Sequence, residues 1–280
     1  MKKNLFVKPV LKWVGGKRQL LDEINQLIPK NIGTYIEPFV GGGAVLFDLQ
    51  PDKAIINDFN KELMNVYQVI KDHPNELIDE LKVHKANNDS EYFYKIRSMD
   101  REVSYGYLNN IIKASRIIYL NKTCYNGLYR VNQAGFFNTP YGKYKNPDIV
   151  NEITIKAISN YFNNNNIKLL HGDYKAALSD VSKGDFVYFD PPYVPISTSS
   201  SFTGYTEGGF NLEHQKELKE VCDNLNAKGV KFLLSNSDSD FIHDLYSGYN
   251  IKIIKAKRAI NSKADLRGDV NEVLVYNYDI

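Results

Sequence analysis

The stretch FDPPY (189–193) constrains the fold of this chain more than any other short segment. The apolar run VYF (187–189) is typical of a buried strand, and it leads directly to Asp190. Proline has a fixed φ and no amide N–H, so Pro191 and Pro192 cannot continue a central strand. Asp190 is therefore predicted to end a strand, at the edge where open α/β sheets bind ligands. The alternative is an aspartate that only caps a rigid turn.

The rest of the chain alternates strand and helix patterns, which predicts an α/β fold with a mostly parallel, layered sheet. Strand patterns occur at 34–39, 54–57, 167–172, 185–190, 231–236, 251–257 and 272–278. Helix patterns occur at 19–28, 44–49, 61–72, 74–86 and 213–227. The last two strands are close in sequence, which favours an antiparallel pair at an edge of the sheet.

The alternation is interrupted between residues 59 and 165, which predicts an inserted domain. The expected catalytic, cofactor-binding domain consists of residues 1–58 and 166–280, and the insert spans 59–165. The asparagine tract at 163–166 is the expected linker back into the sheet.

Composition restricts the partners and the compartment. A net charge of +2 over 280 residues means that any nucleic-acid surface must be local. Two cysteines make neither a disulfide framework nor a metal site, which favours a reducing compartment. Lysines interrupt the apolar N-terminal stretch, which is not typical of a signal peptide, and no apolar run approaches membrane-spanning length. We expect a cytoplasmic protein that does not contact a membrane.

The insert carries a local basic surface, because no acidic residue occurs between Glu102 and Asp148. This interval holds six cationic residues, Lys113, Arg116, Lys122, Arg130, Lys143 and Lys145. It also holds seven tyrosines, at positions 105, 107, 119, 125, 129, 141 and 144. Cations suit phosphates, and arginine and amides suit base edges, so the pattern predicts a nucleic-acid face. The alternative is a solvated basic face whose tyrosines lie partly in the core.

Two glycine-containing segments predict a nucleoside-type cofactor site. In EPFVGGGAV (37–45), glycines between a strand and a helix let a ligand approach backbone N–H groups closely. Asp58 ends the next strand, where it can accept hydrogen bonds from a ribose diol or cap the following helix. In KWVGGKRQL (12–20), Trp13 and Lys17 flank two glycines, and Lys17 can bind a carboxylate.

Together these motifs resemble the Dam family (D12 class) of DNA adenine-N6 methyltransferases, particularly those that act on GATC. The resemblance covers nearly the whole chain, through KWVGGKRQL, EPFVGGGAVLF, INDFN, CYNGLYRVN, FNTPYGKY, GD, YFDPPY, LSNS and EVLVYNY. It implies a Rossmann-like, S-adenosylmethionine-dependent methyltransferase sheet. It also implies that the insert is a mainly helical DNA-recognition domain that carries a hairpin.

The resemblance implies S-adenosyl-L-methionine as the cofactor, and no metal. The residues implied to bind it are Trp13, Lys17, Glu37, Phe39, Gly41, Gly43, Asp58, Asp173 and Asp190. Lys17 would face the methionine part, and the segment from Phe39 to Gly43 would line the methionine and the ribose. Asp58 would hold the ribose hydroxyls. Asp173 would bind the adenine, although a Gly-Asp turn explains that residue equally well.

The implied catalytic residues are Asp190, Pro191, Pro192 and Tyr193. The adenine amino nitrogen is a poor nucleophile because its lone pair is delocalised into the ring. The Asp190 carboxylate and the Pro191 carbonyl can accept its two N–H hydrogens and so orient the lone pair. The target adenine must be flipped out of the duplex, and Tyr193 is implied to stack on it.

CYNGLYRVN and FNTPYGKY are implied to form the hairpin that contacts double-stranded DNA. The implied contact residues are Tyr125, Asn126, Arg130, Asn138, Pro140 and Tyr144. Arg130 suits the two acceptors of guanine. We expect a monomer that acts either alone or as the functional partner of a restriction endonuclease.

Three alternatives belong to other classes of protein. A nicotinamide-dependent oxidoreductase explains the glycines and Asp58, but neither DPPY nor the glycine spacing. A methyltransferase of RNA or of a protein amide shares the motif, but protein-glutamine enzymes typically begin it with Asn, where this chain has Asp190. A DNA-binding protein with a relic methylase fold does not require the intact motif positions seen here.

Overall fold

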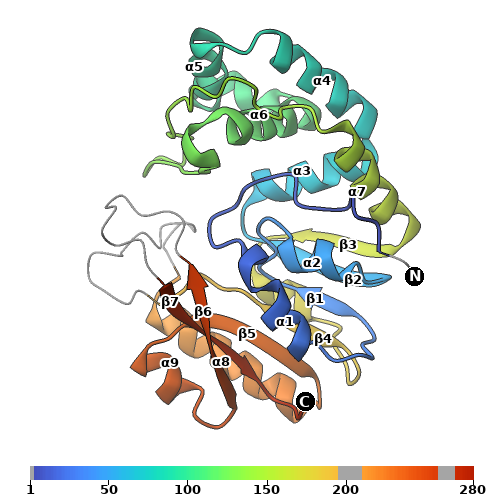
Figure 1. Ribbon diagram of the computed structural model, residues 1–280, viewed down its shortest axis with the longest axis vertical. Helices are drawn as coiled ribbons and strands as arrows, with labels where there is room; N and C mark the ends of the chain where they lie inside the picture. The colour runs from blue at the N-terminus through green and yellow to red at the C-terminus, as the bar shows by residue number, and fades with distance from the viewer. Residues whose placement is uncertain (1–2, 195–209, 258–268) are drawn as a thin grey trace. The chain divides into compact units, whose positions relative to one another are not determined.

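The computed structural model describes residues 3–194, 210–257 and 269–280 (Figure 1). The strands are β1 (Tyr35–Glu37), β2 (Lys53–Asp58), β3 (Asn166–His171), β4 (Phe186–Phe189), β5 (Lys231–Ser237), β6 (Asn250–Lys257) and β7 (Asp269–Tyr276). They form a sheet in the order β3-β2-β1-β4-β5-β7-β6, which confirms the mixed α/β fold. β1 is parallel to β2 and β4, and β4 is parallel to β5. β7 is antiparallel to β5 and β6, so the predicted antiparallel pair is confirmed, with β7 as its inner strand.

Contacts within the chain divide it into two compact units. The helical unit consists of residues 3–16, 41–52 and 60–171, and the sheet unit consists of 17–40, 53–59 and the described part of 172–280. The division of the chain into a catalytic and a DNA-recognition domain stays a prediction. Within the described ranges, no helix is both long and apolar enough to cross a bilayer.

The sheet unit is organised around β4, whose four residues FVYF are all buried. The strand ends at Phe189, one residue earlier than predicted, because the following prolines cannot extend its ladder. The helical segments of this unit are η1 (Lys17–Leu20), α1 (Leu21–Leu27), η5 (Tyr174–Leu178), α8 (Leu212–Ala227) and α9 (Asp240–Leu245), of which η1 and η5 are 3-10 helices. α8 packs on β5 and begins at a capping box between Asn211 and His214 (Figure 1).

The helical unit holds α2 (Ala44–Leu49), α3 (Lys61–Asp72), α4 (Pro74–Ala86), α5 (Ser90–Ser98), α6 (Asn110–Thr123) and α7 (Glu152–Asn164). It also holds the 3-10 helices η2 (Met99–Arg101), η3 (Val103–Tyr107) and η4 (Tyr125–Gly127). α6 packs against α3, α4 and α5 and forms the centre of the unit (Figure 1). Four of the helices begin at a side chain that accepts a backbone N–H: Asn60, Asp89, Asn109 and Asn151.

The asparagine tract at 163–166 joins α7 to β3, a strand of the sheet, as predicted, but most of it belongs to those two elements rather than to a separate linker. Its first two residues end α7, and Asn166 begins β3. The amide of Asn163 donates to the carbonyl of Lys71 at 2.8 Å, and the amide of Asn165 donates to the carbonyl of Tyr161 at 2.8 Å. Asparagine amides can satisfy the carbonyls left unpaired at a helix end, so this tract is ordered structure rather than a flexible connection.

Candidate functional site

The FDPPY loop leaves the carboxyl end of β4 in the sheet unit, as the sequence predicts. Two buried amides hold it. Gln215 of α8, 1% exposed, donates to the Pro192 carbonyl at 2.8 Å. Asn236 of β5, 0% exposed, donates to the Gln215 side chain at 3.1 Å and accepts from the Val194 N–H at 3.2 Å. The backbone on both sides of Tyr193 is thereby fixed.

Asp190 pairs with Lys17, whose Nζ lies 2.9 Å from Oδ1 of the carboxylate. Lys17 is only 5% exposed, so this ion pair is largely removed from water. Burial raises the pKa of Asp190 to about 6, and the positive charge of Lys17 partly opposes that rise. Asp190 is therefore a carboxylate at neutral pH, with a pKa suited to holding a proton transiently.

Two contacts hold the Tyr193 side chain, one at its hydroxyl and one at the face of its ring. Its hydroxyl donates to Glu272 Oε2 of β7 at 2.7 Å, and Nζ of Lys17 lies 4.6 Å from the centroid of its ring. Burial raises the pKa of the Tyr193 phenol, and the neighbouring carboxylates of Asp190 and Glu272 raise it further. The phenol therefore stays neutral, and the ring is fixed in a single orientation.

The ends of β1 and β2 bring acceptor groups together in the same unit. Glu37, 2% exposed, accepts from the Tyr35 hydroxyl at 2.8 Å, and Asp58 is half-buried at the end of β2. Between them in sequence, Asn57 donates to the carbonyls of Pro38 and Gly172 at 3.1 and 3.0 Å. Its Oδ1 is buried without a hydrogen-bond partner among the described residues. These acceptors suit the hydroxyl and ammonium donors of a nucleoside-type ligand.

Two further predicted cofactor residues, Phe39 and Asp173, lie in the same sheet unit. Phe39 is half-buried and stacks on Tyr174, with ring centroids 5.1 Å apart. Asp173 is exposed, and its Oδ1 accepts the Lys175 N–H at 2.8 Å at the start of η5. The turn that the sequence offered as an explanation of Asp173 is therefore present.

The remaining predicted cofactor residues belong to the helical unit. Gly41 and Gly43 have positive φ, 47° and 69°, which only glycine adopts freely. A Cβ on Gly41 would lie 3.0 Å from Cδ1 of Trp13, and one on Gly43 would lie 2.8 Å from Cε2 of Phe47. The indole of Trp13 therefore lies directly against the glycine loop, and its other neighbour is Tyr129, stacked at 4.8 Å.

The predicted hairpin, residues 124–144, also lies in the helical unit. Isolated bridges join Cys124 to Tyr141 and Val131 to Phe137. Arg130 is exposed, and its Nε donates to Asn138 Oδ1 at 2.7 Å. The other predicted contact residues, Tyr125, Asn126, Pro140 and Tyr144, are exposed as well. The structure thus presents these residues on the surface of one local element.

The basic surface of the insert contains fewer residues than its sequence suggests. Arg116 is only 2% exposed and forms an ion pair with Asp100, so it belongs to the core. Tyr119 and Tyr129 are buried as well, at 0% and 8% exposure. The predicted alternative, in which tyrosines lie partly in the core, is correct for these two residues.

Sequence reasoning missed Gln215, Asn236 and Glu272 as residues that hold the FDPPY loop. Asn236 carried a signal, because it lies near the end of the strand that neighbours β4, where polar side chains meet the same edge of a sheet. Gln215 lies within a helix pattern, and nothing in its local sequence separates it from a solvated residue.

Comparison with known proteins gives one consistent family. The model of the D12 class N6 adenine-specific DNA methyltransferases matches residues 13–260. The Type II methyltransferase M1.LlaDCHI of Lactococcus lactis subsp. cremoris is 46% identical over 277 residues, which cover 99% of this chain and 98% of the relative. The Type II methyltransferase M.MjaIII of Methanocaldococcus jannaschii is 45% identical over 97% of this chain and 99% of its own. The DNA adenine methylase of Serratia marcescens is 33% identical over 98% of each chain.

These matches favour DNA over the RNA, protein-amide and nicotinamide alternatives, and the seven-stranded mixed sheet is consistent with a methyltransferase fold. They extend over the FDPPY loop, the glycine loop and the hairpin alike. The chain belongs to the family of D12 class N6 adenine-specific DNA methyltransferases.

Proposed function

We propose that this enzyme transfers the methyl group of S-adenosyl-L-methionine to N6 of an adenine flipped out of duplex DNA, within the sequence GATC. The observation that carries the proposal is the anchored FDPPY loop. It presents the Asp190 carboxylate at a strand end, held by Lys17 at 2.9 Å. The DNA adenine methylase names among the relatives support adenine in DNA as the target.

The chain's own residues supply orientation and charge. When bound, S-adenosylmethionine provides a methyl group activated by its sulfonium. Asp190 and the carbonyl of Pro191 accept the two N–H hydrogens of the adenine amine, which directs the nitrogen lone pair out of the ring plane. Because its pKa is about 6, the Asp190 carboxylate can also take the proton that the amine loses.

Tyr193 offsets part of the cost of flipping the base. Extruding a base costs a few kcal/mol, and stacking on an aromatic ring returns about 1–3 kcal/mol. The ring of Tyr193 is already fixed by Glu272 and Lys17, so little side-chain entropy is lost when a base stacks on it.

The predicted cofactor residues fit the proposed ligand within each unit. In the sheet unit, the acceptors of Glu37, Asp58 and Asn57 suit the ribose hydroxyls and the ammonium group, and the Asn57 Oδ1 has no hydrogen-bond partner in the described part of the chain. Lys17 would contact the methionine carboxylate. In the helical unit, Trp13, Gly41 and Gly43 stay proposed cofactor contacts, and the positive φ of both glycines gives this loop its shape.

The first test is incubation of the purified enzyme with S-adenosylmethionine and duplexes that contain either GATC or a scrambled site. We expect N6-methyladenine, measured by mass spectrometry, only in the GATC duplex. Methylation of adenines in both duplexes would retain the chemistry and reject the sequence preference. Cofactor binding without methylation of either duplex would contradict DNA as the substrate.

Replacing Arg130 by alanine is expected to relax sequence preference while cofactor binding survives. A bidentate contact to guanine provides about 1–3 kcal/mol of discrimination, so the ratio of kcat/KM for GATC over a guanine-substituted site should fall by about 5- to 150-fold. Lys145→Ala removes the same charge from an exposed position nearby and should leave this ratio unchanged. Unchanged discrimination in Arg130→Ala would show that the hairpin does not read guanine through this residue.

We further propose that the enzyme works as a monomer in the cytoplasm. A functional pairing with a restriction endonuclease is supported by the Type II methyltransferase names of two relatives.

A further inference from the structure

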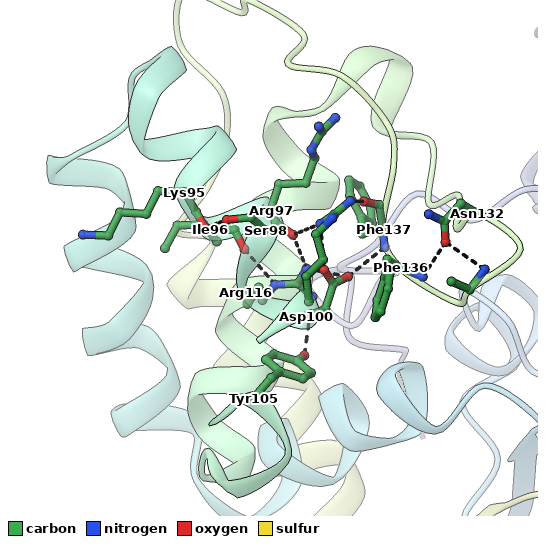
Figure 2. A network of polar contacts seen from close by, with 12 residues as sticks. Lys95, Ile96, Arg97, Ser98, Asp100, Tyr105, Arg116, Asn132, Phe136 and Phe137 are labelled. Atoms are coloured by element: carbon green, nitrogen blue, oxygen red, sulfur yellow. Dashed lines mark hydrogen bonds and ion pairs between the residues drawn. The ribbon is translucent and has the colours of Figure 1, made fainter. Parts of the chain in front are cut away.

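A network of polar contacts joins the core of the helical unit to the backbone of the hairpin (Figure 2). At its centre is Arg116 of α6, 2% exposed. Its guanidinium donates to the carbonyls of Ile96 and Arg97, at 2.9 and 2.8 Å, and pairs with Asp100 at 2.8 Å. A buried guanidinium with this many partners is costly to move, so it fixes the position of Asp100.

Asp100 and Arg101 of η2 together hold both polar backbone groups of one hairpin residue, Phe137. Oδ2 of Asp100 accepts the Phe137 N–H at 2.7 Å, and Nη2 of Arg101 donates to the Phe137 carbonyl at 3.0 Å. Asp100 and Arg101 also pair with each other at 2.9 Å. Figure 2 shows Asp100 lying between Arg116 and Phe137.

Phe137 is directly linked to the residue that we propose reads guanine. It bridges Val131, the neighbour of Arg130. The next residue, Asn138, donates its backbone N–H to the Arg130 carbonyl at 2.9 Å and accepts from the Arg130 guanidinium at 2.7 Å. The position of the Phe137 backbone therefore determines where the Arg130 side chain is held.

We propose that Asp100 and Arg101 are positioning residues for sequence recognition, which clamp the Phe137 backbone so that the hairpin presents Arg130 in one orientation. The inference rests on the proposed role of Arg130 in contacting guanine. Bidentate recognition of a base requires a fixed direction for the guanidinium fork, and a contact held by a rigid support loses less entropy on binding. The hairpin itself is a short element held by isolated bridges. The clamp supplies the rigid support that it needs.

The test compares Arg101→Met with Lys95→Met. Lys95 lies in α5, and Figure 2 shows its side chain pointing away from Asp100 and Phe137. Both variants remove one positive charge, but only Arg101→Met removes the bond to the Phe137 carbonyl. We expect Arg101→Met to reduce the kcat/KM ratio of GATC over guanine-substituted duplexes by at least about fivefold. Lys95→Met should keep the wild-type ratio, and the two variants should unfold at similar temperatures.

The salt dependence of DNA binding separates this role from a direct phosphate contact. A lost phosphate contact weakens binding to every duplex alike and reduces the slope of log K against log salt by about 0.9. The clamp predicts an unchanged slope and a changed discrimination ratio. A uniform loss with the smaller slope would overturn the proposal.

Arg130→Ala in the same assay keeps failure of the clamp distinct from failure of the proposed function. Loss of discrimination in Arg130→Ala but not in Arg101→Met would reject the clamp alone. Wild-type discrimination in both variants would reject Arg130 as the guanine reader, and the clamp with it.

Discussion

Replacing Asp190 by asparagine is expected to lower kcat by about 10²- to 10⁴-fold, the range typical of a group that handles a proton in the transition state. Asparagine has nearly the same shape, but its amide carries no charge and cannot take the proton that the adenine amine loses. The nitrogen must become a better nucleophile as the methyl group arrives. The negative charge of Asp190 therefore acts most strongly in the transition state, so the loss should fall on kcat.

The measurement is single-turnover methylation of a GATC duplex by the wild type and by Asp190→Asn. DNA binding, followed by fluorescence anisotropy, should stay close to that of the wild type, because the substitution leaves the proposed DNA-contact residues of the hairpin unchanged. Thermal unfolding provides the control for the fold. The substitution removes the ion-pair partner of Lys17, which destabilises the fold. It also removes a buried negative charge that is costly to desolvate, which partly offsets that loss. A kcat within tenfold of the wild type would exclude the Asp190 carboxylate as the essential proton acceptor.

The parts of the site that the sequence predicts are those fixed by local backbone chemistry. Prolines after an apolar strand must end it, so FDPPY predicts the strand end at β4 and the placement of Asp190. The glycines at 41–43 likewise predict the loop before α2, and Gly41 and Gly43 have the positive φ that such a loop uses. Both inferences depend only on neighbouring residues, which is why they hold.

The parts that the sequence does not predict depend on contacts between distant segments. Gln215 lies 23 positions from the Pro192 carbonyl that it holds, in a helix whose other polar residues are solvated. Arg116 has the same sequence context as a surface cation, and only the packing of α6 against its neighbours shows that it is buried. The clamp on Phe137 joins residues 36 and 37 positions apart. Pattern and propensity carry no information about such pairs.

The acid limb of the pH–rate profile is expected to report Asp190. Burial raises the pKa of this carboxyl group from its ordinary value to about 6, so the acceptor is protonated as the pH falls through that value. A protonated carboxyl loses the charge that polarises the amine, and kcat/KM should fall by about tenfold for each pH unit below 6. Above pH 7 the carboxylate form dominates, and the profile should be flat until another group titrates.

Lys17→Met tests this assignment, because its effect on the pKa has a definite sign. The Lys17 ammonium, 2.9 Å from the carboxylate, lowers the pKa of Asp190, whereas burial and Glu272 raise it. Removing the ammonium leaves the raising effects unopposed, so the acid limb should move to higher pH. Lys216→Met is the matched control, since Lys216 pairs with the exposed Glu213 of α8 and should leave the limb at its wild-type position. If Lys17→Met keeps the wild-type limb, a group other than Asp190 controls it, and the buried ion pair serves the structure of the loop rather than the charge of the acceptor.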